Sequence, residues 1–239
     1  MRMTPEPRFA RVAAMIGDPT RARMLAVLLG GSYFSAGEIA RAAGVTPQTA
    51  SSHLAKLIEA EMVALRVQGR HRYFRLADGD IAHALEALSL LAERNTLADK
   101  WSRGAYRPLK HARSCYGHMA GELGVRLLDA LIARGYITPE EGHYQLTDAG
   151  RGWLHSIGVD ESGSVRNDRR YAYPCLDWSE RRDHLAGVLA IALLDRFVAQ
   201  GWLARTPDSR ALNVTVAGQR MLMPLLERKL VSTVSTASD

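Results

Sequence analysis

The sequence lacks the features that mark several large protein classes. Its longest apolar run without a charge, Leu185 to Leu194, is ten residues, about half of what a membrane-spanning helix needs. Only two cysteines are present, Cys115 and Cys175, which excludes a disulfide-rich scaffold and a four-thiolate zinc site built by one chain. The N-terminus has no apolar core and fails as a secretory signal. We therefore expect a cytoplasmic protein that does not contact a membrane.

The composition is that of a globular protein with an excess of basic over acidic residues. Hydrophobic residues make up 47% of the 239 and charged residues 23%, which excludes a collagen-like or disordered chain. Lys and Arg number 31 against 25 Asp and Glu, for a net charge of +6. This excess is compatible with a polyanionic partner such as nucleic acid.

The first hundred residues predict a winged helix. Asp18-Pro19 is a helix-entry signal, Gly44 ends a short helix, and Thr46-Pro47 caps the next one. Strand-forming residues flank Gly69-Arg70, which indicates a two-stranded hairpin. Helix, tight turn, helix and hairpin together form a winged helix-turn-helix. Ile81 to Ala98 then has the apolar spacing of a long amphipathic helix, suited to pairing two subunits.

The second half contains an internal repeat. His118 to Ile137 aligns without gaps to His184 to Leu203, with nine identical residues in 20. Residues 145–150 and 213–218 continue the match. Each copy predicts a helix, two short strands and a second helix, and repeats of this size usually bury their apolar faces on each other.

The expected fold is therefore mainly α with small β-hairpins. It consists of an N-terminal winged helix-turn-helix and a C-terminal α+β domain made of two similar winged-helix-like repeats. The predicted organisation is a DNA-binding and dimerisation domain over 1–100, an effector domain over 101–231 with repeats at about 115–157 and 175–230, and a disordered tail at 232–239.

Several separated motifs occur in order along the first hundred residues: Asp18-Pro19-Thr20-Arg21, Gly37-Glu38-Ile39-Ala40, Gly44 to Leu54, and Gly69 to Leu76. Together they resemble the ArsR/SmtB family of winged-helix transcriptional regulators, in its longer subgroup with a C-terminal extension. The resemblance implies a homodimeric repressor that leaves double-stranded operator DNA when a metal, metalloid or other stress signal binds.

The same segments suit duplex DNA by their chemistry. The second helix of the motif offers hydrogen-bonding side chains to the major groove, and the hairpin offers four arginines to phosphates or the minor groove. A basic hairpin used for protein contacts and a chromatin-like binder without sequence preference are the alternatives. The expected DNA-binding residues are Gln48, Thr49, Ser51, Ser52, His53, Lys56, Arg66, Arg70, Arg72 and Arg75.

Two metal sites common in the family do not transfer to this sequence. Gly31 to Ala36 has no Cys-x-Cys pair, and Asp80, His83, Glu86 and Glu93 do not reproduce the acid and histidine spacing of the last-helix site. An effector site must lie elsewhere.

Each repeat instead carries one cysteine near a histidine that precedes its first helix. Cys115, His118, Cys175 and His184 suit a thiophilic ion such as arsenite, zinc, cadmium or mercury. The alternatives are an oxidation switch at thiols of lowered pKa, and an organic ligand lined by Trp153, Trp178 and Trp202. The plainer interpretations are buried structural cysteines, histidines that cap the helices, and tryptophans that pack in the core.

An enzyme is the remaining rival class, since a Cys-His pair is the minimum for a thiol nucleophile. No G-x-S-x-G, phosphate loop or H-E-x-x-H is present. We therefore expect a regulator without catalytic activity.

Overall fold

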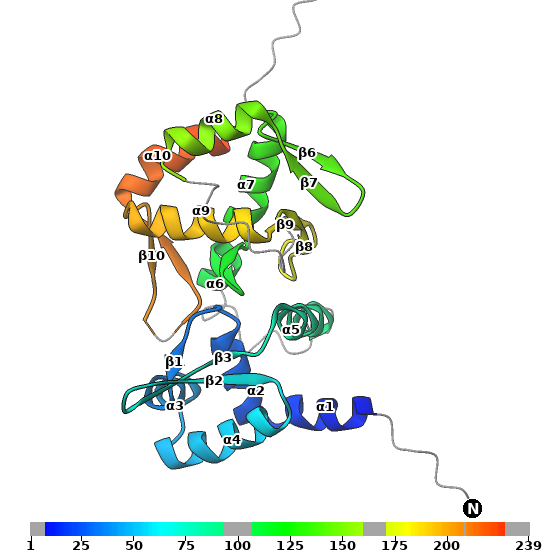
Figure 1. Cartoon of the computed structure of the whole chain (residues 1–239), viewed down its shortest axis with the longest axis vertical. Coiled ribbons are helices and arrows are strands. Elements are labelled where there is room, and N and C mark those ends of the chain that lie inside the picture. Colours follow the sequence, from blue (N-terminus) through cyan, green and yellow to red (C-terminus); the bar gives the residue numbers. More distant parts are fainter. Residues whose placement is uncertain (1–7, 93–106, 160–170, 208, 228–239) are drawn as a thin grey trace, which may run out of the picture.

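The computed structural model describes residues 8–92, 107–159, 171–207 and 209–227. Figure 1 shows two regions stacked along the long axis of the molecule, with helix α5 (Gly79–Ala92) lying between them. The predicted fold class, mainly α with small antiparallel hairpins, is confirmed. No helix within the described ranges is both long enough and apolar enough to cross a membrane.

The N-terminal region is the predicted winged helix. Local signals set its helix boundaries. Asp18 accepts hydrogen bonds from the N–H groups of Thr20 and Arg21, and Thr46 caps the second helix of the helix-turn-helix through the N–H of Thr49. Ser35 and Glu38 form a reciprocal capping box. The helices are α1 (Arg8–Ile16), α2 (Pro19–Leu28), α3 (Ala36–Ala43) and α4 (Pro47–Glu59).

The wing is an antiparallel three-stranded sheet in the order β1-β3-β2. Gly69, at φ 60°, makes the tight turn between the two long strands. Leu76 and Phe74 face a core shared with α2, α3 and α4. The strands are β1 (Phe34–Ser35), β2 (Val63–Gln68) and β3 (His71–Leu76).

Helix α5 has buried residues on one face and large apolar residues exposed elsewhere on its surface. Ala82, Leu85 and Glu86 are buried, whereas Leu88 and Leu91 are 42% and 53% exposed. The predicted helix over residues 81–98 is confirmed as far as Ala92. Residues 93–98 and the predicted tail at 232–239 lie outside the described residues.

The C-terminal region is built from the predicted repeat. In each copy a threonine caps the second helix, Thr147 in the first and Thr215 in the second. The glycine three residues later lies so close to another backbone segment that a Cβ would come within 2.1 Å of a carbonyl oxygen at Gly150 and within 2.0 Å at Gly218. The repeated Thr-x-x-Gly is therefore explained by a close approach of two backbones. One copy has α7 (Glu122–Ala133), β6 (Ile137–Glu140), β7 (His143–Leu146) and α8 (Asp148–Ser156), and the other α9 (Val188–Ala199), β10 (Leu203–Arg205), β11 (Leu212–Val214) and α10 (Val216–Leu226).

Each repeat begins with a further hairpin that the sequence patterns do not predict. Strands β4 (Arg113–Cys115) and β5 (His118–Ala120), which follow the short helix α6 (Arg107–His111), form the first hairpin. Strands β8 (Tyr173–Leu176) and β9 (Asp183–Ala186) form the second. These strands are too short to show an apolar alternation, which is why only the tertiary structure reveals them.

Candidate functional site

Helix α4 presents a polar face to solvent. Ala50, Leu54 and Leu57 are buried in the core of the winged helix. The opposite face exposes five of the predicted DNA-binding residues, Gln48, Thr49, Ser51, Ser52 and Lys56. The Ser51 hydroxyl donates to the Pro47 carbonyl, and the Thr46 and Thr49 hydroxyls lie 2.9 Å apart. Gln48, Ser52 and Lys56 are therefore the side chains of this face that project most freely.

His53 has a different position from the other candidates on α4. It is half-buried, and its Nδ1 lies 3.5 Å from the Arg21 guanidinium and 3.8 Å from the Asp18 carboxylate. Arg21 in turn donates to the carbonyls of Met15 and Ala14. His53 thus braces α4 against the α1–α2 junction.

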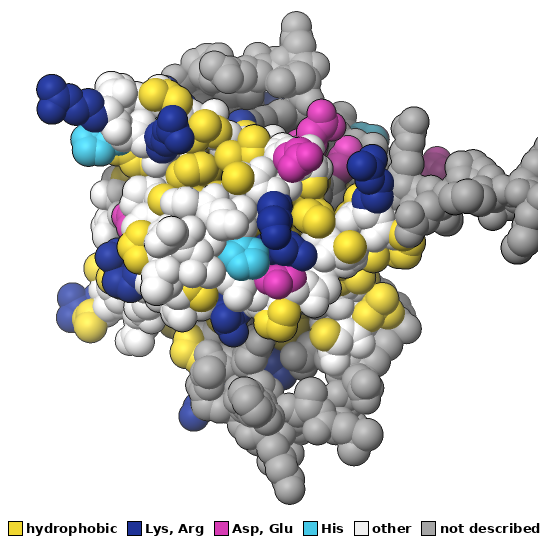
Figure 2. Space-filling model, turned by 90° about the horizontal axis from the view of Figure 1, so that it is seen from below, with side chains coloured by type: hydrophobic (Ala, Val, Ile, Leu, Met, Phe, Trp, Pro, Cys, Tyr) yellow, Lys and Arg dark blue, Asp and Glu magenta, His cyan; other side chains and the backbone are white. Residues whose placement is uncertain are grey.

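The wing arginines fall into two pairs. Arg66 and Arg75 share one face of the hairpin, and their guanidinium groups lie 5.6 and 5.0 Å from the centre of the Tyr33 ring. Arg70 and Arg72 extend into solvent at and beside the turn. Figure 2 shows that Lys and Arg side chains are spread over this end of the molecule rather than gathered in one patch. The exposed pair is the better placed to reach a DNA backbone.

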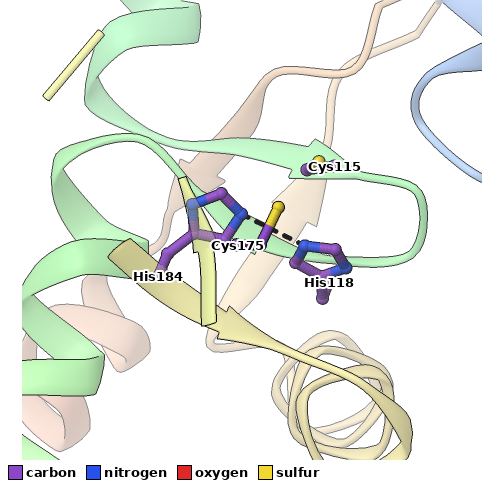
Figure 3. A group of neighbouring side chains, drawn as sticks. All are labelled: Cys115, His118, Cys175 and His184. Atoms are coloured by element: carbon purple, nitrogen blue, oxygen red, sulfur yellow. Dashed lines mark hydrogen bonds between the residues drawn. The ribbon is translucent and has the colours of Figure 1, made fainter. Parts of the chain in front are cut away.

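The two hairpins of the C-terminal region bring the four predicted effector residues together. Cys115 faces His118 across β4–β5, and Cys175 faces His184 across β8–β9 in the same register. The two sulfur atoms and one nitrogen of each imidazole all lie within 4.8 Å of one another, and all four residues are buried (Figure 3). The two Nε2 atoms are 3.1 Å apart.

This donor set fits a soft divalent ion. A tetrahedral zinc ion, held about 2.3 Å from sulfur and about 2.0 Å from nitrogen, keeps its ligand atoms roughly 3.3 to 3.8 Å apart. The four ligand atoms of the cluster lie within 4.8 Å of one another, so its widest pair is at most about 1 Å farther apart than in a zinc site. Two thiolates and two imidazoles in tetrahedral geometry are typical of zinc sites.

Burial and neighbouring groups shift the protonation of the cluster. A hydrogen bond with Cys175, together with burial, raises the pKa of the Cys115 thiol to about 12. The thiolate is the form that is oxidised and the form that ligates a metal ion, so the raised pKa opposes both reactions until a metal ion displaces the proton. Burial lowers the pKa of His118, which leaves its imidazole neutral and able to ligate. A metal ion can still displace the thiol protons on binding.

Asp177 supports one of the two histidines. Its Oδ2 lies 3.2 Å from His184 Nδ1 and accepts the Gly121 N–H at 2.7 Å, while its Oδ1 lies 3.0 Å from Arg113 Nη2. A carboxylate at Nδ1 keeps a proton there and leaves Nε2 directed at the cluster. Burial opposes a charge on His184, but the neighbouring Asp177 carboxylate outweighs it and raises the pKa of His184 to about 9. Burial also opposes ionisation of Asp177, yet His184 and Arg113 hold the pKa of this carboxyl well below its usual range.

Sequence reasoning missed Asp177 because it lies in a run of charged residues that resembles a helix start. The structure has a turn there, in which the N–H groups of Ser179 and Glu180 donate to Asp177 Oδ1. Ser179 therefore caps no helix, because the segment between β8 and β9 is a turn. The charged neighbours carry no signal that singles out one buried carboxylate.

Two further interpretations are corrected or resolved by the structure. His118 and His184 lie on strands β5 and β9, and the residues before α7 and α9 are Gly121 and Gly187 without a side-chain cap. The histidines therefore do not cap these helices. The tryptophans pack against other side chains: Trp153 on Tyr136, Trp202 on Phe197, and Trp178 beneath the Arg113 guanidinium at 4.5 Å.

Comparison with known proteins gives matches along most of the chain. Residues 16–66 match a family described as a helix-turn-helix domain. The uncharacterised HTH-type transcriptional regulator YdfF of Bacillus subtilis (strain 168) is 37% identical over 213 residues, which are 89% of this chain and 94% of that protein. The HTH-type transcriptional regulator CmtR of Mycobacterium tuberculosis (strain ATCC 25618 / H37Rv) is 36% identical over 83 residues, 35% of this chain and 70% of that protein.

Solved structures are similar to part of the chain. The NMR structure of the cadmium metal-sensor CMTR from Mycobacterium tuberculosis is 35% identical and covers 33% of this chain and 81% of its own, with a TM-score of 0.30. The homodimeric winged helix-turn-helix domain of Mb0332 from Mycobacterium bovis, described as a possible ArsR-family regulator, is 25% identical and covers 40% and 93%, with a TM-score of 0.35. With a relative matched over nearly its whole length and with the motifs of the winged helix in place, the chain belongs to the ArsR/SmtB-like family of HTH-type transcriptional regulators.

Proposed function

We propose that the protein is a homodimeric repressor that leaves its operator when a thiophilic metal ion binds Cys115, His118, Cys175 and His184. The observation that carries the proposal is the convergence of these four buried ligand atoms within 4.8 Å. Burying two thiols and two imidazoles together has a desolvation cost that a bound metal offsets. Zinc and cadmium fit the donor set best, and the similarity to a cadmium sensor supports this choice.

The DNA-binding part of the proposal rests on α4 and the wing. Gln48, Ser52 and Lys56 would meet base edges and phosphates in the major groove. Arg70 and Arg72 would meet the flanking backbone, where each neutralised phosphate releases a counterion. Two such units on one dimer predict a palindromic operator with half-sites set by the dimer spacing.

A second copy of the chain would cover the apolar residues left exposed on α1 and α5. Phe9 is 77% exposed and Val12 43%, and Leu88 and Leu91 are also exposed on α5. Exposed apolar residues that gather on two helices are typical of a protein interface. The similarity to a homodimeric winged helix domain supports the same assignment.

A regulator without catalytic activity fits the cluster better than an enzyme does. Catalytic zinc sites keep one coordination position open for water or substrate, whereas four protein ligands close the site. The four side chains here are all buried.

The test is the fluorescence anisotropy of the reduced protein on a labelled duplex from its own upstream region. Cadmium and zinc are titrated in parallel with arsenite, mercuric ion and peroxide, and metal uptake is followed by absorbance. We expect release at about one ion per chain. The double variant Cys115→Ser/Cys175→Ser should bind DNA normally and stay bound, whereas His143→Ala, an exposed histidine on β7, should behave as wild type. Ion binding without release, or release from the double variant, would refute the proposal.

A further inference from the structure

Strand β4 has the cluster on one side and the winged helix on the other. The Cys115 thiol belongs to the cluster. The residues on either side of it bond to the end of α2: the Ser114 hydroxyl donates to the Gly30 carbonyl at 2.8 Å, and the Tyr116 N–H donates to the Leu29 carbonyl at 2.6 Å. Ser114 is 1% exposed, so this contact is sealed from water.

The backbones at this contact meet without intervening side chains. Gly31 has a φ of 78°, and a Cβ built on it would lie 2.4 Å from the Gly117 nitrogen. The turn of the β4–β5 hairpin therefore packs directly on the segment that follows α2. A closely packed contact of this kind passes a displacement on rather than absorbing it.

Arg113 makes a second link from the same strand to the winged helix. It is fully buried, and its Nη2 lies 3.0 Å from Asp177, the carboxylate that supports His184, and 3.5 Å from Glu86 on α5. Glu86 is also paired with Arg210. Breaking a buried pair by removing one charge is strongly unfavourable, so these groups tend to move together.

An ion bound at the cluster would draw the four ligand atoms together. The ligand atoms lie within 4.8 Å of one another, whereas a tetrahedral ion requires its widest pair to be about 3.8 Å apart. Any pair of ligand atoms wider than this would be drawn in by up to roughly 1 Å when an ion binds. Cys115 is one of the proposed ligands, and the residues before it contact the winged helix: Ser114 bonds to the end of α2, and Arg113 pairs with Glu86 on α5.

We propose that β4 couples the cluster to the DNA-binding region through two contacts, the Ser114–Gly30 hydrogen bond and the Arg113–Glu86 ion pair. This inference rests on the proposed function, because it assigns the route by which the bound ion alters the winged helix. Ser114 and Glu86 act in coupling without ligating the ion. Their loss should weaken release while leaving both separate affinities close to those of wild type.

The experiment measures DNA affinity with and without cadmium, and cadmium affinity by absorbance, in wild type, Ser114→Ala and Glu86→Gln. The ratio of the two DNA affinities is the coupling, which typically lies within about 5- to 150-fold in such systems. One buried hydrogen bond corresponds to about fivefold, so we expect each variant to lose about fivefold of the coupling. Ser156→Ala, whose hydroxyl donates within α8, and Glu140→Gln on exposed β6 are the matched controls.

The outcomes separate this inference from the proposed function. If wild type binds cadmium and keeps its DNA, the proposed function fails. If wild type releases DNA and both variants release it equally well, the coupling role of β4 is overturned. Ser114→Ala removes a single neutral hydrogen bond. It therefore remains informative if Glu86→Gln, which takes away the carboxylate paired with buried Arg210 and one of the two carboxylates beside Arg113, does not fold. Loss of cadmium affinity in Ser114→Ala would place Ser114 in the site itself and would also overturn the assignment.

Discussion

The two hairpins that form the cluster carry the same ligands but differ in how they support them. Both place a cysteine opposite a histidine in one register. In the first hairpin only Tyr116 and Gly117 separate the strands, whereas residues 177–182 separate them in the second and include Asp177. Consequently the pKa of His184 is raised to about 9, while burial lowers the pKa of His118. The repeat thus duplicates the ligands, and an inserted loop makes one of them different.

The difference extends to what each hairpin contacts. The first bonds to the end of α2 through Ser114 and Tyr116. The second meets α5 through Tyr173, whose ring lies 5.9 Å from the ring of His83. Two copies of one unit therefore reach different helices, so the repeat places a symmetric set of potential ligands in an asymmetric setting.

The largest expected effect tests whether the two cysteines are equivalent. Cys115→Ser and Cys175→Ser should each lower cadmium affinity by more than about 100-fold. A side chain that binds the ion directly contributes more than the groups that hydrogen-bond to the ligands, whose loss costs about 10- to 100-fold. Absorbance of the cadmium–thiolate band measures both. A large loss in one variant alone would show that only one hairpin holds the ion.

An intermediate effect tests the support that only one hairpin has. Asp177→Asn should lower cadmium affinity by about 10- to 100-fold, because Asn holds the His184 imidazole less firmly in the required tautomer. Competition with a chelator of known affinity measures the change. The control is Asp183→Asn, an exposed acid on the same hairpin. Equal affinities in the two variants would mean that Asp177 supports the fold alone.

The smallest effect concerns pH. The raised pKa of Cys115 and that of His184 mean that both groups carry protons at neutral pH, and these protons leave when an ion binds. Cadmium affinity should therefore rise with pH between about 6 and 8. Asp177→Asn should make the rise less steep, because His184 then loses its proton at lower pH. Identical slopes in wild type and variant would contradict the assignment of the His184 proton.

Much of the winged helix is predictable because its signals are local. Asp18, Thr46 and Gly44 mark helix ends within a few residues of the groups they bond. Gly69 marks the turn of the wing in the same way. The direction of His53 was not predictable, since the Arg21 side chain that it faces lies on another helix.

For the candidate site, the sequence alone determined the repeat, and with it the presence of one Cys and one His before each of two similar helices. Only the tertiary structure decided that residues from positions 115 and 175 meet, that Asp177 supports one histidine, and that Arg113 and Glu86 pair across the two regions. The physical reason is that caps and turns depend on neighbours in the chain, whereas the pKa values, the burial and the ion pairs of the cluster depend on which distant segments pack together.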